Sequence, residues 1–137
     1  MSFGDRYWET VALGPFNSDG DETRAVARVS GKAIVKSIDV FNTTATATHA
    51  TNYITYTLVN LGTDASGTTV IATASTSQTG GSAIAAHVAF PLTITAANAA
   101  VAAGDTLGFV RDEANTNAAA LAACTVVVKY QNIGPMS

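Results

Sequence analysis

The sequence predicts an all-β protein, a single-domain antiparallel β-sandwich of about eight strands with a jelly-roll-like topology. Apolar residues recur at every second position over much of the chain, as they do in half-buried strands. Turn-type stretches such as NSDGDE, GTDASG and TSQTGG separate these segments, and 137 residues suit one domain. An immunoglobulin-like sandwich is the alternative, but one Cys and one Trp give no Cys…Trp…Cys spacing.

The candidate strands are short and alternate apolar with small polar residues. Ile34, Ile38 and Val40 mark the third, and Ile54, Tyr56 and Leu58 mark the fourth. The other expected strands cover residues 7–13, 23–29, 68–75, 83–92, 106–112 and 121–131.

The segment 83–92 has the longest regular alternation. We expect one face of this strand to be buried and to carry Ile84, Ala86, Val88, Phe90 and Leu92. We expect the other face to point outward and to carry Ala83, Ala85, His87, Ala89 and Pro91.

The Ala-rich stretch 96–103 has no amphipathic stripe and ends at Gly104, which predicts a loop with one helical turn. Gly104 and Asp105 then form a turn, because Gly permits it and an Asp side chain can bind backbone amides nearby. Leu107 and Phe109 follow at core spacing. We interpret this turn as a hinge of the scaffold.

Cys124 is the only cysteine, so no disulfide can form within the chain. It shares a strand face with Val126, Val128 and Tyr130. This position predicts a buried, inert thiol, because a catalytic thiol needs a partner base and nothing places a histidine nearby.

Composition excludes several classes of protein. The net charge is −3, charged residues make up 12% of the chain, and no cluster of Lys and Arg exists, so a nucleic-acid partner is not expected. No apolar run reaches membrane-spanning length, and MSFGDRYWET lacks the pattern of a signal peptide. We expect folding in a reducing cytoplasm and a surface rich in Ala, Thr, Ser and Asn that packs flatly against other protein.

The acidic loop NSDGDE is the main candidate for a metal-binding site. Asp19, Asp21 and Glu22 surround Gly20, but their spacing does not match an EF-hand loop, and a Gly-Asp hairpin turn explains the same residues. His49 lies in a Thr/Ala loop. We expect no metal, no cofactor and no enzymatic activity.

The N-terminal segment holds four of the chain's ten aromatic residues: Phe3, Tyr7, Trp8 and Phe16. Aromatic side chains are the usual anchors of interfaces, so we expect an attachment arm here. The alternative is that Val11 and Leu13 belong to a first strand, and both can hold. The expected division is an arm with the first strand over residues 1–17 and a sandwich domain over residues 18–137.

A second expected contact is the outward face of residues 83–91, where Ala83, Ala85 and Ala89 flank His87. Solvent-facing strands usually carry charged residues or Thr, and small side chains let a partner approach closely. This face predicts self-association, with a homotrimer as the expected state.

Five stretches occur in a characteristic order: GPFNSDGDE, TNYITYTLVNLGTDASGTT, TGGSAIAAHVAFPLTIT, VAAGDTLGFV and TVVVKYQ. In this order, over about residues 10 to 131, the chain resembles the capsid decoration (cement) proteins of tailed bacteriophages. Two patterns carry most of the resemblance, NYxTxxLxNxGxxxxGTT and AxxAGDxLxF. The Ala-rich segments 96–103 and 118–123 depart from it.

The resemblance implies a small β-domain, often trimeric, that is made in the cytoplasm of a host bacterium and lies on the outer face of a phage head. Its partner would be the major capsid protein, and its role would be to stabilise the shell. It brings no catalytic residue. The alternative is a non-catalytic β-sandwich module that binds carbohydrate or a receptor, on a phage fibre or a secreted protein. A sugar-binding module usually presents several coplanar aromatic residues, and Tyr53, the clearest strand aromatic off the face of Ile54, Tyr56 and Leu58, is too little for this.

Overall fold

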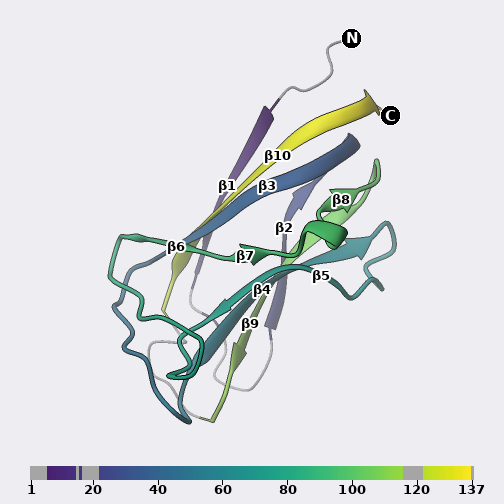
Figure 1. The fold of residues 1–137 in the computed structure, drawn as a ribbon. Helices are drawn as coiled ribbons and strands as arrows, with labels where there is room; N and C mark the ends of the chain where they lie inside the picture. The colour runs from purple at the N-terminus through teal and green to yellow at the C-terminus, as the bar shows by residue number, and fades with distance from the viewer. Residues whose placement is uncertain (1–5, 15, 17–21, 116–121, 137) are drawn as a thin grey trace.

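The computed structural model describes residues 6–14, 16, 22–115 and 122–136 (Figure 1). Almost all regular structure in this part is strand, with a single 3₁₀ turn, η1. The elements are β1 (Arg6–Leu13), β2 (Glu22–Arg28), β3 (Gly31–Asn42), β4 (Ile54–Gly62), β5 (Thr69–Ser75), β6 (Ala89–Pro91), β7 (Thr93–Ile94), η1 (Ala96–Asn98), β8 (Ala100–Val101), β9 (Thr106–Glu113) and β10 (Cys124–Met136).

The strands form two antiparallel sheets that pack as a sandwich (Figure 1). Sheet A has the order β1-β10-β3-β6, and β8 also pairs with β3. Sheet B has the order β2-β9-β4-β5-β7. The predicted antiparallel β-sandwich is confirmed.

The strand order is that of a jelly roll. β6 and β8 both pair with β3, so they fill one strand position in two pieces. Counted this way, sheet A holds the first, eighth, third and sixth positions, and sheet B holds the second, seventh, fourth and fifth, with the two-residue β7 added at the edge. The chain changes sheet at every connection except the β4–β5 hairpin.

The core lies between the sheets and is built from the inward positions of both. Tyr56 of β4 sits at its centre, with its ring 5.1 Å from that of Phe109 and 6.1 Å from that of Phe90. Leu58 and Val126 are fully buried beside this aromatic group. Burial of such side chains is the main source of the fold's stability.

A β-bulge in β3 changes which side chains face the core. Tyr130 of β10 pairs with Val35, but the preceding Lys129 pairs with Ser37, so Lys36 is an extra residue. Burial therefore passes from Val35 to Ile38. Simple alternation would place Ile34 and Ile38 on the same face of the strand. The extra residue ends this alternation, and Ile34 is only partly buried.

The predicted strand over residues 83–92 is corrected to the three residues of β6. His87 has φ of 61°, in the left-handed region, and a turn there interrupts the extended chain. Ile84, Phe90 and Leu92 are buried as expected, whereas Val88 is 55% exposed. The alternation therefore indicated burial correctly on both sides of the turn and failed within it.

The Ala-rich stretch and the turn after it agree with prediction. One helical turn, η1, precedes the short β8. Gly104 has φ of 89°, which favours glycine, and its N–H donates to the Val29 carbonyl at 2.8 Å. Leu107 and Phe109 then enter the core.

Candidate functional site

The two sheets present outer faces of different character. All three lysines of the chain lie on sheet A, Lys32 and Lys36 in β3 and Lys129 in β10. The middle of the outer face of sheet B is instead uncharged and consists of small polar and aliphatic residues. These are Thr23, Ala25, Thr57, Val59, Leu61, Thr73 and Val110.

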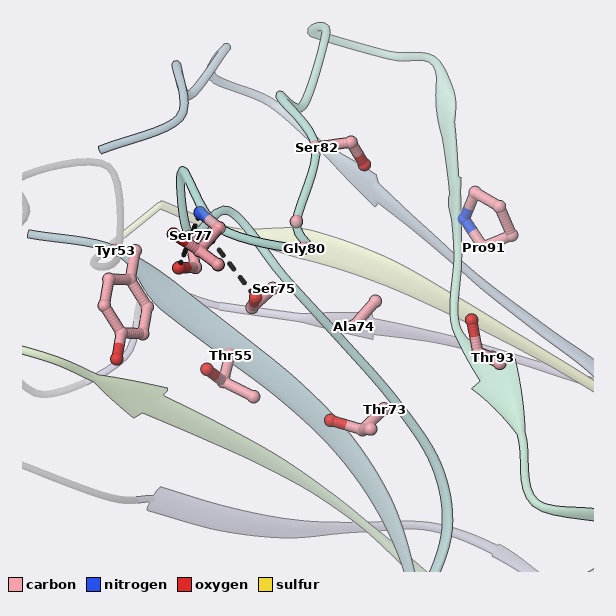
Figure 2. A pocket seen from close by; sticks show the side chains of 12 residues that line it. Tyr53, Thr55, Thr73, Ala74, Ser75, Ser77, Gly80, Ser82, Pro91 and Thr93 are labelled. Atoms are coloured by element: carbon pink, nitrogen blue, oxygen red, sulfur yellow. Dashed lines mark hydrogen bonds between the residues drawn. The ribbon is translucent and has the colours of Figure 1, made fainter. Parts of the chain in front are cut away.

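A hollow of about 730 Å³ lies on sheet B where β4 and β5 meet the loop that follows β5. We call it the hydroxyl hollow because most of its side chains are alcohols. Figure 2 shows Tyr53 on one side, Pro91 and Thr93 on the other, and Thr55 and Thr73 between them. It is lined by Tyr53, Thr55, Thr73, Ala74, Ser75, Ser77, Thr79, Gly80, Gly81, Ser82, Pro91 and Thr93.

The rim of the hydroxyl hollow is a tight loop over residues 75–82. The Ser82 N–H donates to the Ser75 carbonyl at 3.1 Å, and the Gly81 N–H donates to the Ser77 carbonyl at 3.1 Å. A Cβ added at Gly81 would lie 2.5 Å from both of these carbonyl oxygens. Gly80 has φ of 80°. Gly81 has no room for a Cβ and the backbone of Gly80 favours glycine, so the sequence TGG supports the shape of the rim.

Several polar groups that line the hollow have no partner within the described part of the chain. No hydrogen bond to another described residue is made by the hydroxyls of Thr55, Ser82 and Thr93. The same holds for the phenol of Tyr53. The Ser75 and Ser77 hydroxyls, by contrast, accept from the Ser77 and Thr79 N–H groups at 3.3 Å. The hollow therefore has fixed hydroxyls that shape it and free hydroxyls that can bind.

A second hollow, of about 470 Å³, lies on the same sheet and is more aliphatic. Val59, Leu61 and Val110 line it together with Ala25. Leu61 fits against the sheet because β9 has Gly108 there, where an added Cβ would lie 2.8 Å from Leu61 Cδ1. We call this surface the apolar hollow.

The segment 83–89, which leads into the first residue of β6, has a defined shape, and we call it the Ala loop. Thr46 and Ile84 exchange two backbone hydrogen bonds of 2.8 Å, and the His87 N–H donates to the Asn42 carbonyl at 2.8 Å. Ala83, Ala85, His87 and Ala89, the residues predicted to face outward, are exposed. Val88, predicted to face inward, is exposed with them. Their role as contacts stays a prediction.

The aromatic residues of the N-terminal segment separate into three cases. Phe3 lies outside the described residues. Tyr7 and Trp8 belong to β1 and pair with Tyr130 and Lys129 of β10. Strand β1 pairs with β10 from Arg6 to Leu13, so this part of the segment belongs to the sandwich, and an arm role is left to the residues before it.

Phe16 requires a correction, because it is a core residue and not a surface anchor. Its side chain is 4% exposed, and its ring centroid lies 6.3 Å from that of Phe109. The guanidinium carbons of Arg24 and Arg111 lie 4.1 and 4.3 Å from the Phe16 ring. These cation–π contacts hold a buried arginine against the end of the core, which apolar spacing in the sequence does not reveal.

Cys124 is buried, as predicted. Burial raises the pKa of its thiol to about 11, because a thiolate is poorly solvated in the core. Tyr56 lies in the same region and donates a 2.9 Å hydrogen bond to Asn42 Oδ1. Burial also raises the pKa of the Tyr56 phenol. Both groups remain neutral at ordinary pH.

The His49 side chain supports the structure of its own loop. His49 Nδ1 accepts from the backbone N–H groups of Thr51 and Asn52 at 3.1 and 2.9 Å. Within the described residues, no group of three or more His, Cys, Asp or Glu side chains is placed to bind a metal ion. Asp19 and Asp21 lie outside these residues, and Glu22 of β2 forms an ion pair with Arg24.

No helix in the described part of the chain has the length and apolarity needed to cross a membrane.

The sequence matches no protein-family model and no curated protein sequence. Among solved structures, it is similar to a chain of the cyanophage Pam1 capsid asymmetric unit, with 18% identity, a TM-score of 0.46, and coverage of 95% of this chain and 86% of that one. It is also similar to a chain of Desmodium yellow mottle tymovirus, with 10% identity, a TM-score of 0.35, and coverage of 97% and 89%.

A further similarity is to a chain of infectious bursal disease virus, Gx strain, with 10% identity and a TM-score of 0.34. It covers 97% of this chain but 42% of the viral one. Similarity at this level concerns the course of the strands and assigns no role to this chain.

Proposed function

We propose that this chain is a structural virion protein that binds the outer surface of a phage head as a homotrimer and stabilises the shell. Its partner would be the major capsid protein. The five sequence stretches that occur in a characteristic order along the chain support the proposal. The jelly-roll order of the strands is compatible with it. The observation that carries it is the Ala loop.

The Ala loop has the properties of a preformed contact surface. The backbone hydrogen bonds of Ile84 and His87 and the pairing of Ala89 with Phe41 hold it in place, so little conformational entropy would be lost on binding. Between and beside these points it exposes Ala85, Val88 and Ala89, with His87 as the polar side chain among them. Exposed apolar side chains gathered on one rigid loop favour burial against another protein.

The uncharged outer face of sheet B offers further contact area. The apolar hollow of Val59, Leu61 and Val110 would receive a side chain of a sister subunit or of the shell. Charged residues are depleted in the cores of protein interfaces, which agrees with the absence of charge in the middle of this described face. The lysine-bearing face of sheet A is then the better candidate for exposure to solvent.

Binding to heads that lack the protein is the direct test. Purified protein is mixed with such heads, and the bound fraction is measured after sedimentation. Ala85→Glu should reduce binding strongly, since it would place an unpaired charge in an apolar interface. Ala97→Glu, at an exposed position of η1, is the matched control and should bind as wild type. Equal binding of the two variants would contradict the proposed role of the Ala loop.

The stabilising role has a separate readout. Heads with bound protein should release their DNA at a higher temperature than heads without it, as followed by a DNA-binding dye. Sedimentation equilibrium of the free protein tests the trimer. A monomer mass at all concentrations, together with isolated single copies on the head surface, would overturn the trimer.

A further inference from the structure

We propose that the hydroxyl hollow is a binding site for a neutral sugar residue. The inference rests on the lining of this hollow and on its fixed rim. It does not depend on the proposed capsid role, and the lining contains no residue of the Ala loop, although Ser82 and Pro91 adjoin that loop in the chain.

The absence of charge in the lining selects the class of ligand. All of its side chains are neutral, and alcohols predominate among them. A charged ligand would lose hydration here without gaining an opposite charge, whereas a polyol exchanges its hydrogen bonds to water for hydrogen bonds to hydroxyls. The volume of about 730 Å³ suits a small ligand, and the hollow is partly open, so a sugar could enter as the end of a longer glycan.

The free hydroxyls are distributed around the hollow. Thr55 lies on its floor in β4, Thr93 on the far side in β7, and Ser82 on the rim (Figure 2). Each hydroxyl can both donate and accept, and none is used within the described part of the chain. Three separate elements therefore offer hydrogen bonds from different directions, which suits a ring with several hydroxyl groups.

Tyr53 adds an apolar wall to this polar lining. Its ring stands at the side of the hollow opposite Pro91 and Thr93 (Figure 2). The side chain is only partly buried, so one part of the ring is available. Sugar rings have apolar C–H faces as well as hydroxyl edges, and an aromatic ring next to hydroxyl groups matches both.

The rim is formed before any ligand arrives. The Gln78 N–H donates to the His49 carbonyl at 2.9 Å, which ties the 75–82 loop to the loop before β4. Gly81 packs against the Ser75 and Ser77 backbone with no room for a side chain. A rigid site loses little entropy on binding, so even a few hydrogen bonds can give measurable affinity.

The experiment uses the full chain labelled with ¹⁵N and a panel of free sugars at tens of millimolar. The panel contains glucose, galactose, mannose and N-acetylglucosamine, with glucuronate as a charged comparison. We expect at least one neutral sugar to shift the amide signals of residues 53–55, 73–82 and 93 in a saturable way, and glucuronate to bind more weakly than glucose. Failure of every neutral sugar to shift these signals, or shifts confined to other surfaces, would overturn the proposal.

Variants assign the site. Tyr53→Ala should weaken binding about tenfold, whereas Tyr53→Phe should keep most of it, because the ring supplies the apolar contact. Thr93→Val should also weaken binding, and it tests the site if Tyr53→Ala does not fold. Thr125→Val makes the same change on β10 of the other sheet and should leave affinity unchanged. Equal affinity of the Tyr53→Ala, Thr93→Val and Thr125→Val variants would refute the site.

Discussion

Asn60 and Asp105 join the end of β4 to the turn that precedes β9. Asn60 Nδ2 donates to Asp105 Oδ2 at 2.9 Å, across 45 residues of sequence. The same carboxylate oxygen accepts from the Ala102 N–H at 2.9 Å, and Asn60 Oδ1 accepts from the Gly62 N–H at 2.9 Å. One carboxylate therefore fixes its own turn and a neighbouring strand of sheet B.

The first prediction follows from this double role. Asp105→Ala removes the acceptor of two hydrogen bonds and leaves the Ala102 N–H and the Asn60 amide without it. We expect the free energy of unfolding to fall by about 1–3 kcal/mol, measured by urea denaturation. The control is Asp64→Ala, because Asp64 is exposed and its side chain accepts hydrogen bonds from Ser66 within its own turn. Asp64→Ala should destabilise the protein clearly less than Asp105→Ala does. A larger loss for Asp64→Ala would refute the double role of the Asp105 carboxylate.

The second prediction concerns the fit of Leu61 over Gly108. Gly108→Ala should destabilise the protein, because the new Cβ would lie 2.8 Å from Leu61 Cδ1 and 3.2 Å from Thr23 Cγ2. In a Leu61→Ala background the side chain that the new Cβ would contact is gone. Gly108→Ala should then lower the free energy of unfolding by about 1 kcal/mol less than it does in the wild-type chain. A double-mutant cycle by thermal or urea unfolding measures this coupling. Additive effects of the two substitutions would show that Leu61 is not what requires the glycine.

The sequence predicted the Gly104-Asp105 turn because turn formation is local: a glycine and a carboxylate act on backbone groups a few residues away. It did not predict Asn60 as the partner, since that contact depends on β4 and β9 being neighbours. Strand order arises from pairing between distant segments, and the sequence carries no short-range signal for it. The same limit applies to the hydroxyl hollow, whose residues come from β4, β5, β6 and β7, from the loop after β5, and from Tyr53 just before β4.

The errors in the sequence prediction have local causes. An alternating pattern records which residues are buried, and Ile84, Phe90 and Leu92 are buried. It does not reveal a left-handed residue such as His87 that turns the chain between them. The gathering of aromatic residues near the N-terminus predicts a surface role for Phe16, yet its side chain is buried and two arginines lie against its ring.

The third prediction is that Cys124 is unreactive in the folded protein at neutral pH. The thiol is buried and its pKa is raised to about 11, so both access and thiolate population are low. Labelling by a thiol reagent should be slow in native protein and fast in urea. Cys124→Ala should lower stability by only about 1 kcal/mol. Rapid labelling of native protein would contradict the buried position.

The fourth prediction is a loss of stability at alkaline pH. The Cys124 thiol ionises near its ordinary pKa of 9.0 when unfolded but at about 11 when folded. Its contribution to stability is therefore complete below pH 9 and is lost as the pH rises to about 11, by an amount on the order of 2 kcal/mol. Unfolding in urea at several pH values measures this loss. Cys124→Ala should show a smaller fall than wild type, and an unchanged fall would assign the effect to other groups such as Tyr56.

The fifth prediction concerns the buried pair of Tyr56 and Asn42. Tyr56→Phe keeps the ring contacts with Phe90 and Phe109 but removes the donor to Asn42 Oδ1, which lies 2.9 Å away. An unsatisfied buried amide oxygen should cost about 1–3 kcal/mol in urea unfolding. The double variant Tyr56→Phe with Asn42→Ala tests the coupling. If it is no more stable than the sum of the single changes predicts, the hydrogen bond has little net effect.

The last prediction separates the proposed attachment arm from the first strand. β1 begins at Arg6 and pairs with β10 from there, so deletion of residues 1–9 would remove four paired positions and would weaken sheet A itself. Deletion of residues 1–5 removes Phe3 but leaves every described pair of β1 in place. We therefore expect the shorter deletion to keep the wild-type far-UV spectrum and cooperative melting while losing affinity for heads, since an aromatic anchor would be gone.

Phe3→Ala in the full-length chain is the matched test, and Phe3→Leu should retain part of the binding. Both are compared with wild type by sedimentation with heads that lack the protein. If the chain without residues 1–5 melts normally and binds heads as tightly as wild type, these residues are not an attachment arm. Attachment must then come from the sandwich itself, and the Ala85→Glu variant becomes the decisive measurement.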